Sequence, residues 1–122
     1  MKILETDSIN ITILDDKMVQ IDVHVDGVEI DKEKCKLAHA LVANEMPGDY
    51  GVIINRKADY SIMPLDVYEV HNAHEHLKAI ALVTYENRHS LPVATEQRLF
   101  NGELDEFDSI DKAREWIEQV VN

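Results

Sequence analysis

The sequence is poor in several residue types, and each shortage narrows what the protein can be. One cysteine, Cys35, occurs among the 122 residues. A single cysteine excludes an intramolecular disulfide and a multi-cysteine zinc site. Four glycines leave little material for a loop that wraps a nucleotide phosphate. The apolar runs fall short of the roughly 18 residues that a membrane-spanning helix needs, so we expect no such span.

Basic residues are also scarce. Lysine and arginine total 12 against 24 acidic residues, for a net charge of −12. Because binding to phosphate groups requires clustered basic side chains, this balance argues against nucleic acid as the partner. An anionic membrane surface is disfavoured for the same reason. The first seven residues become acidic before a signal-peptide core could form. We therefore expect a cytoplasmic protein, which also fits the use of cysteine.

What remains is an ordinary globular composition, with 45% hydrophobic and 30% charged residues. A chain of this length corresponds to one domain of about 100–150 residues, so residues 1–122 are expected to form a single domain. Residues 9–14 and 18–25 alternate apolar and polar side chains, which predicts a β-hairpin with one lightly covered face. Continuous apolar runs at 50–54 and 77–85 predict buried strands, and 103–107 predicts an edge strand.

After the hairpin, and again after each later strand, apolar residues recur at the spacing of a helix. Helices are predicted at 32–46, 64–76, 91–100 and 110–121, from apolar stripes and from capping or stop signals. Strands that alternate with helices indicate parallel pairs joined by crossovers. The expected fold class is therefore α/β, with a mixed β-sheet, an N-terminal β-hairpin and about four helices.

This order of elements resembles the STAS domain, and more particularly the SpoIIAA-like proteins with the fold of anti-sigma-factor antagonists. The resemblance depends on the opening hairpin at 9–25, on Gly51-Val52-Ile53-Ile54-Asn55, and on the closing segment from Phe107 to Ile117. It implies a non-catalytic regulatory module of bacterial type that binds a protein partner. A structural link between SpoIIAA-like proteins and CRAL-TRIO lipid carriers also implies an apolar pocket, and hence a lipid-like ligand.

Ser61 is the candidate phosphoacceptor. In signalling members of the resembled family, a serine at the start of the helix after the central strand is phosphorylated by a partner kinase, which breaks binding. Ser61 occupies the matching position, although Asp59 to Pro64 lack the family's glycine. A helix N-terminus favours phosphate or another anion. The alternative is that Ser61, or Met63, simply caps the helix.

Four residues after two predicted parallel strands form a candidate anion site. Arg56 and Lys57 follow one strand, and Arg88 and His89 follow the other. Ligands of open α/β sheets bind beyond the carboxyl ends of the strands, so these residues, with Ser61, could bind an anionic ligand. The alternative is that they are solubilising charges held in surface ion pairs.

Histidine and cysteine give weaker candidates. His71 and His74, three residues apart on the second helix, could share a metal ion, but no further ligand is predictable near them. Cys35 and His39 are four residues apart on one helix and could touch, yet Cys35 lies on the apolar stripe and is expected to be a buried structural thiol. We therefore expect no metal and no cofactor.

No recognisable catalytic motif occurs in the sequence, and the protein is not expected to be an enzyme. The leading hypothesis is a regulatory protein–protein interaction module switched near Ser61. The alternative is a carrier or sensor of a small apolar or anionic ligand. A homodimer stays open as well, because a strand at the end of the sheet could expose an edge.

Overall fold

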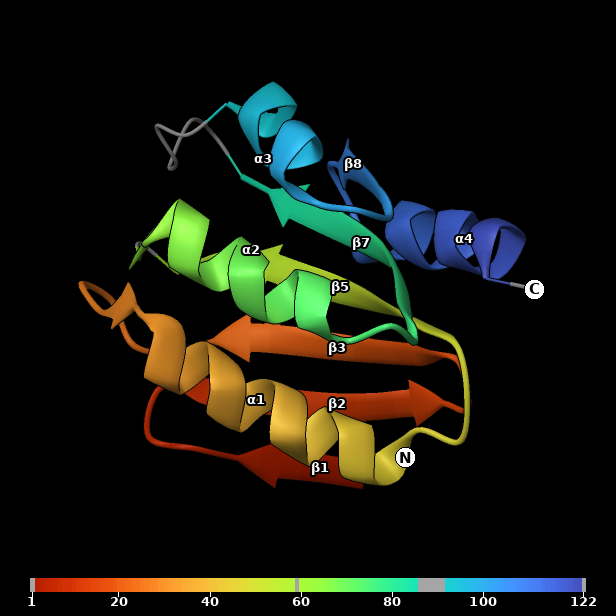
Figure 1. Ribbon diagram of the computed structural model, residues 1–122, viewed down its shortest axis with the longest axis horizontal. Coiled ribbons are helices and arrows are strands. Elements are labelled where there is room, and N and C mark those ends of the chain that lie inside the picture. Colours follow the sequence, from red (N-terminus) through yellow and green to blue (C-terminus); the bar gives the residue numbers. More distant parts are fainter. Residues whose placement is uncertain (1, 59, 86–91, 122) are drawn as a thin grey trace.

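The computed structural model describes residues 2–58, 60–85 and 92–121. At its centre is a six-stranded sheet with strand order β1-β2-β3-β5-β7-β8 (Figure 1). Its strands are β1 (Lys2–Glu5), β2 (Ile9–Asp15), β3 (Met18–Val23), β5 (Tyr50–Arg56), β7 (Leu77–Thr84) and β8 (Glu103–Phe107). Two short strands, β4 (Glu29–Ile30) and β6 (Ser61–Ile62), pair with each other in parallel.

The sheet is mixed. β1, β2 and β3 pair in antiparallel fashion, whereas β3, β5, β7 and β8 pair in parallel. The β2–β3 turn is short, and the backbone N–H of Lys17 donates to Asp15 Oδ1 at 2.8 Å within it. The parallel strands need longer connections, and each of these contains a helix. The segment with alternating polarity near the start of the chain therefore forms strands of the antiparallel half of the sheet. The strands joined by helical crossovers form the parallel half.

Within residues 2–58, 60–85 and 92–121, four helices cover the sheet: α1 (Lys32–Glu45), α2 (Pro64–Ala73), α3 (Val93–Leu99) and α4 (Ile110–Val120). Side chains cap two of them, because Asp31 Oδ1 accepts from the Lys34 N–H at 3.0 Å and Ser109 Oγ from the Lys112 N–H at 3.2 Å. None of the helices within the described ranges is long and apolar enough to cross a membrane.

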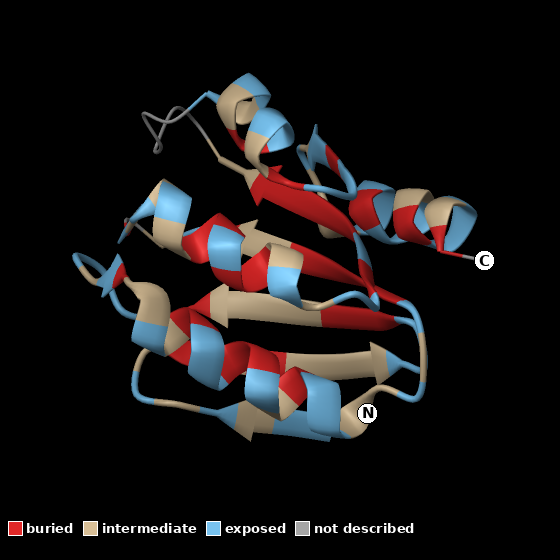
Figure 2. Ribbon diagram, in the orientation of Figure 1, coloured by how far each residue is buried: buried red, intermediate tan, exposed pale blue. Residues whose placement is uncertain are grey.

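The helices lie on opposite faces of the sheet and form two separate cores. Successive strand residues point to opposite faces, so Val52 and Ile80 pack with α1, α2 and α3, whereas Ile53 and Ala79 pack with α4. The central strands β5 and β7 are therefore buried along most of their length (Figure 2). Gly51 permits the close approach of α4, since a Cβ atom there would lie 2.7 Å from Ile117 Cγ2.

The predicted α/β fold class, the hairpin and the four helices are confirmed. Three strands were not predicted: β1, β4 and β6. The polar segment after the central strand was predicted as a connection from residue 55, but β5 extends through Arg56, because it keeps pairing with β7 up to Thr84. The apolar stripe predicted for the helix over 64–76 includes Leu65, and this part of the prediction is wrong, because Leu65 is 74% exposed.

Candidate functional site

A small cavity lies between α1, α2 and the sheet. Its volume is about 50 Å³. Aliphatic side chains form most of the wall, and the remainder comes from six residues with chemically active groups: Cys35, His39, Arg56, Tyr60, Tyr68 and His71. All six are buried. This combination of an apolar wall and a few polar groups is typical of a ligand site, although the volume is small.

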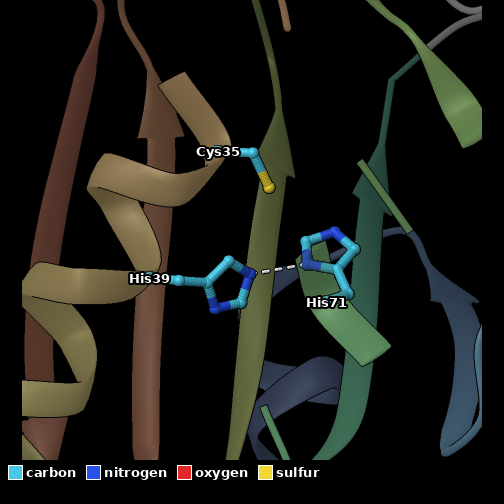
Figure 3. Close-up of side chains that lie close together, drawn as sticks. All are labelled: Cys35, His39 and His71. Atoms are coloured by element: carbon cyan, nitrogen blue, oxygen red, sulfur yellow. Dashed lines mark hydrogen bonds between the residues drawn. The ribbon is translucent and has the colours of Figure 1, made fainter. Parts of the chain in front are cut away.

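Cys35, His39 and His71 form a cluster at this cavity (Figure 3). Cys35 and His39 are four residues apart on α1 and therefore share the face that packs inward. His71 comes from the facing α2, and the distance between His39 Nε2 and His71 Nδ1 is 2.7 Å. One ligand atom from each of the three residues lies within 4.8 Å of the others. Cys35 Sγ also lies 3.8 Å from the Val67 carbonyl oxygen.

Burial keeps this cluster uncharged. It lowers the pKa of His39 to about 3, with a further contribution from His74. It also lowers the pKa of His71 well below its usual value, and His39 and Arg56 act in the same direction. Burial raises the pKa of the Cys35 thiol to about 12. At neutral pH the cluster therefore contains two neutral imidazoles and a thiol.

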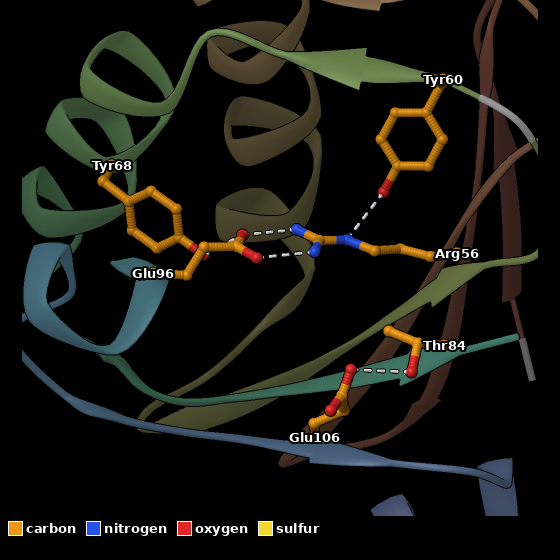
Figure 4. Close-up of polar contacts among 6 residues, drawn as sticks. All are labelled: Arg56, Tyr60, Tyr68, Thr84, Glu96 and Glu106. Atoms are coloured by element: carbon orange, nitrogen blue, oxygen red, sulfur yellow. Dashed lines mark hydrogen bonds and ion pairs between the residues drawn. The ribbon is translucent and has the colours of Figure 1, made fainter. Parts of the chain in front are cut away.

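A buried ion pair between Arg56 and Glu96 lies next to this cavity, because Arg56 forms part of the cavity wall (Figure 4). The Arg56 guanidinium binds Glu96 of α3 through both of its terminal nitrogens, and the Nη1–Oε2 distance is 2.7 Å. Tyr68 donates its hydroxyl to Glu96 Oε1 at 2.7 Å, and Arg56 Nε donates to the Tyr60 hydroxyl at 3.2 Å. Arg56 is 4% exposed and Glu96 0%. Each charge thus has several partners in an environment where an unpaired charge would be very costly.

The network shifts the pKa of its members in a consistent way. Burial alone would lower the pKa of Arg56, but the bonds to Glu96 and the neighbouring groups more than offset it, so the pKa is raised. Burial and the Glu96 carboxylate raise the pKa of Tyr68. Burial likewise raises the pKa of Tyr60. The network therefore holds a cation, an anion and two neutral phenols.

Figure 4 also includes a contact nearer the surface. Thr84 donates its hydroxyl to Glu106 Oε2 at 2.8 Å, which joins the carboxyl end of β7 to β8. Glu106 is exposed. This contact is a local link between neighbouring strands and forms no part of the cavity wall.

The four residues of the predicted anion site fall in different places. Arg56 is in the buried network, while the adjacent Lys57, which follows the end of β5, is exposed. Arg88 and His89 lie outside the described residues. The binding of an anion by this set stays a prediction.

Ser61, the predicted phosphoacceptor, is exposed and lies in β6. Its backbone N–H donates to the Val28 carbonyl at 3.1 Å. The helix begins three residues later at Pro64, and Met63 is its N-cap. Of the two predicted caps, Met63 is therefore the one found. Phosphorylation of Ser61 stays a prediction.

The histidines predicted as weak metal candidates have separate environments. His71 is buried against His39, whereas His74 follows α2, is half-buried, and stacks on the His39 ring with a centroid distance of 4.4 Å. The sequence pattern did not predict that His39 contacts His71, and it gave no indication of Glu96. A signal for His39 was present, because it continues the inward stripe of Cys35 and Val42. Glu96 gave no such signal, since a glutamate in a short helix is usually solvated.

Comparisons with known proteins agree with this architecture. No family model and no curated protein matches the sequence. Among solved structures, the chain is similar to a DUF3478-family protein from Shewanella loihica PV-4 that is described as having a SpoIIAA-like fold. The two share 13% sequence identity with a TM-score of 0.64, and the match covers 90% of this chain and 92% of that one. The chain therefore has a SpoIIAA-like fold, as its order of elements predicted.

Proposed function

We propose that this chain is a non-catalytic, cytoplasmic regulatory module of bacterial STAS type, which binds a protein partner through the surface around Ser61. The observation that supports it most is the pair of large apolar side chains beside Ser61. Met63 is 42% exposed and Leu65 is 74% exposed, and both lie at the start of α2. Exposed apolar side chains that cluster, unlike scattered ones, are typical of interaction sites.

The surface around Ser61 also has features that would let phosphorylation control the binding of the partner. Ser61 is exposed and pairs in register with the exposed Glu29 of β4. A phosphate on Ser61 would add about −1.5 to −2 charges at neutral pH, next to a carboxylate and beside the two apolar side chains. Like-charge repulsion and the cost of removing a phosphate from water would then oppose the binding of an apolar partner surface. We expect phosphorylation at Ser61 to release the partner.

Partner capture from the native host, read by native mass spectrometry, tests this proposal. Leu65→Glu is expected to abolish the complex, and Ser61→Asp to weaken it, while Ser61→Ala retains it. The matched control is Leu37→Glu on α1, because Leu37 is also half exposed, at 51%, but lies on another helix. Equal capture by the wild type, Leu65→Glu and Leu37→Glu would contradict the proposal.

A second candidate function is a carrier or sensor of a small apolar or anionic ligand. The cavity between α1 and α2 favours it, because its wall is largely aliphatic and includes Arg56. A volume of about 50 Å³ accommodates only a few atoms, so a lipid-like ligand would require α1 and α2 to separate. An anion would have to compete with Glu96 for the guanidinium. Mass spectrometry of an organic-solvent extract of the purified protein tests this function, and an extract without a bound compound would count against it.

A homodimer is a further proposal, separate from the Ser61 surface. β1 lies at an edge of the sheet, and its Ile3 is 61% exposed. A second copy that paired along β1 would extend the sheet and cover this side chain. Sedimentation velocity of the wild type and Ile3→Lys measures it: a dimer that the substitution converts to monomer supports the β1 interface, and a monomeric wild type contradicts it.

A further inference from the structure

We propose that Cys35, His39 and His71 bind one Zn²⁺ ion between α1 and α2. The geometry carries this inference, because one ligand atom from each residue lies within 4.8 Å of the others in the protein interior. The three residues come from two helices, and His39 and His71 are 32 positions apart in the sequence. The site is independent of the proposed interaction surface, which involves none of these side chains.

The donor set matches the chemistry of zinc. Sulfur and imidazole nitrogen are its preferred ligands, and bond lengths of about 2.3 Å to sulfur and about 2.0–2.1 Å to nitrogen place tetrahedral ligand atoms roughly 3.3–3.8 Å apart. In the structure the two facing nitrogens are 2.7 Å apart, and the widest separation in the cluster is no more than 4.8 Å. Side-chain movements on the order of 1 Å would convert the cluster to that geometry.

The two imidazoles are already in the form that binds a metal, whereas the Cys35 thiol, whose pKa is raised by burial, must first lose its proton. Both imidazoles are neutral at neutral pH, and a neutral imidazole offers the lone pair that a metal needs. When the Cys35 sulfur forms its bond to zinc, the S–H bond breaks and the proton passes to solvent, so the bound sulfur is a thiolate. One thiolate then offsets half of the charge of the ion, while Glu96 already balances Arg56.

The surroundings leave room for a fourth ligand. A cavity of about 50 Å³ borders all three side chains, and one water molecule needs about 10–15 Å³ of such space. Three protein ligands with a water molecule in the fourth position are a common arrangement for zinc. His74 is half-buried and stacks on His39, so a third imidazole contacts the cluster.

A purely structural role explains the cluster less well. Within the described part of the chain, His39 Nδ1 is buried and has no hydrogen-bond partner. Leaving a buried polar atom unpaired costs about 1–3 kcal/mol, which a leucine at this position would avoid. A buried histidine pair with an unpaired ring atom, beside the chain's one cysteine, therefore costs the fold stability. An ion bound to His39 Nε2 and His71 Nδ1, the two nitrogens that face each other, would offset this cost through its own bonds and not by pairing His39 Nδ1.

Titration of the metal-free protein with Co²⁺, after removal of any affinity tag, tests the site. We expect one Co²⁺ per chain, with the intense visible bands of a four-coordinate ion and a near-ultraviolet sulfur-to-cobalt charge-transfer band. Zn²⁺ should displace the Co²⁺ and remove both signals. A wild-type protein that shows no charge-transfer band, or that binds Co²⁺ with the weak bands of six oxygen ligands, would overturn the proposal.

Variants locate the ligands. Cys35→Ser should remove the charge-transfer band, and His39→Gln or His71→Gln should weaken binding by more than the roughly 10–100-fold loss caused by removing a group that only orients a ligand. The matched control is His76→Gln, because His76 is exposed and pairs with Asp49; it should bind as the wild type does. Circular dichroism of the metal-free variants verifies folding. Unchanged binding in the folded histidine variants would overturn the assignment.

Discussion

The α1–α3 side of the sheet and the α4 side have different interiors. Among the described residues, the α1–α3 side buries His39, Arg56, His71 and Glu96, whereas the buried cluster under α4 consists of aliphatic side chains and one methionine. Both sides belong to one sheet and share its strands. Burying ionisable groups costs stability unless every group is paired. The α4 side therefore provides apolar stabilisation, and the α1–α3 side is where side-chain chemistry is concentrated.

The largest expected effect comes from breaking the ion pair on the α1–α3 side. Glu96→Gln would leave the Arg56 charge buried with no carboxylate, and losing one partner of a buried pair costs about 3–5 kcal/mol. Urea unfolding of the variant measures this loss. The double variant Arg56→Met/Glu96→Leu removes both charges and is expected to be more stable than Glu96→Gln. A double variant less stable than Glu96→Gln would contradict the argument.

Mild acid should also affect the α1–α3 side selectively. The pKa values of His39 and His71 are lowered in the folded protein, so below about pH 6.5 the unfolded chain binds protons that the folded chain does not. The stability present above this pH is lost as the pH falls, by about 1.4 kcal/mol per pH unit for each histidine. For His39, whose pKa is lowered to about 3, the loss between pH 6.5 and pH 5 is about 2 kcal/mol. His71 contributes in the same direction.

Urea unfolding of the metal-free protein at pH 7 and pH 5 measures this acid sensitivity. The control is the double variant His39→Leu/His71→Leu, which lacks both titrating groups and keeps apolar volume at each position. We expect the pH dependence between 7 and 5 to be much weaker in that variant. The same slope in both proteins would contradict the assignment.

On the α4 side, we expect stability to depend on added side-chain volume, because this core contains no buried charge among the described residues. Gly51→Ala would place a Cβ atom 2.7 Å from Ile117 Cγ2, in a region where Ile117 is fully buried. Overpacking of this kind typically costs about 1–3 kcal/mol. Thermal unfolding measures the cost, and because Ile117→Ala removes the Cγ2 atom of the closest contact, the double variant Gly51→Ala/Ile117→Ala should lose less stability than the sum of the two single losses. Gly48→Ala is the control, because the corresponding Cβ atom would meet nothing within 4 Å.

The smallest effects should come from the helix caps, one on each side. Asp31→Ala removes the side-chain acceptor for α1, and Ser109→Ala removes the one for α4. Each is expected to cost about 1 kcal/mol. If the two sides unfold together, each variant shows a single unfolding transition, and its midpoint is lower than that of the wild type. Two separate transitions in one variant, seen by different spectroscopic probes, would show that the sides unfold independently.

The fold could be predicted further than the site. Alternating polarity over residues 9–25 and the apolar runs at 50–54 and 77–85 are local signals, and each local signal produced the element it predicted. The two-residue strands β4 and β6 gave no such signal, because they exist only through pairing with each other. Periodicity cannot report a contact of that kind.

The site depends on long-range contacts, and these were not predictable from local pattern. Arg56 and Glu96 are 40 residues apart, and His39 and His71 are 32 apart. In sequence, Arg56 looks like part of the polar loop predicted from residue 55, whereas pairing with β7 extends the strand through it. His39 was interpreted only as a neighbour of Cys35. The partner of each of these residues became evident only when the helices were placed on the sheet.

The strand order of the main sheet has a consequence for how the chain can fold. Its strands follow one another in the order of the sequence, β1-β2-β3-β5-β7-β8. No strand of this sheet has to insert between two strands that are already paired, so each new strand adds to an edge that exists when it emerges. Because only the loop just synthesised must close at each step, the sheet can grow from its N-terminal hairpin as the ribosome delivers the chain. The last strand and α4 then complete the second core over a sheet that is already formed.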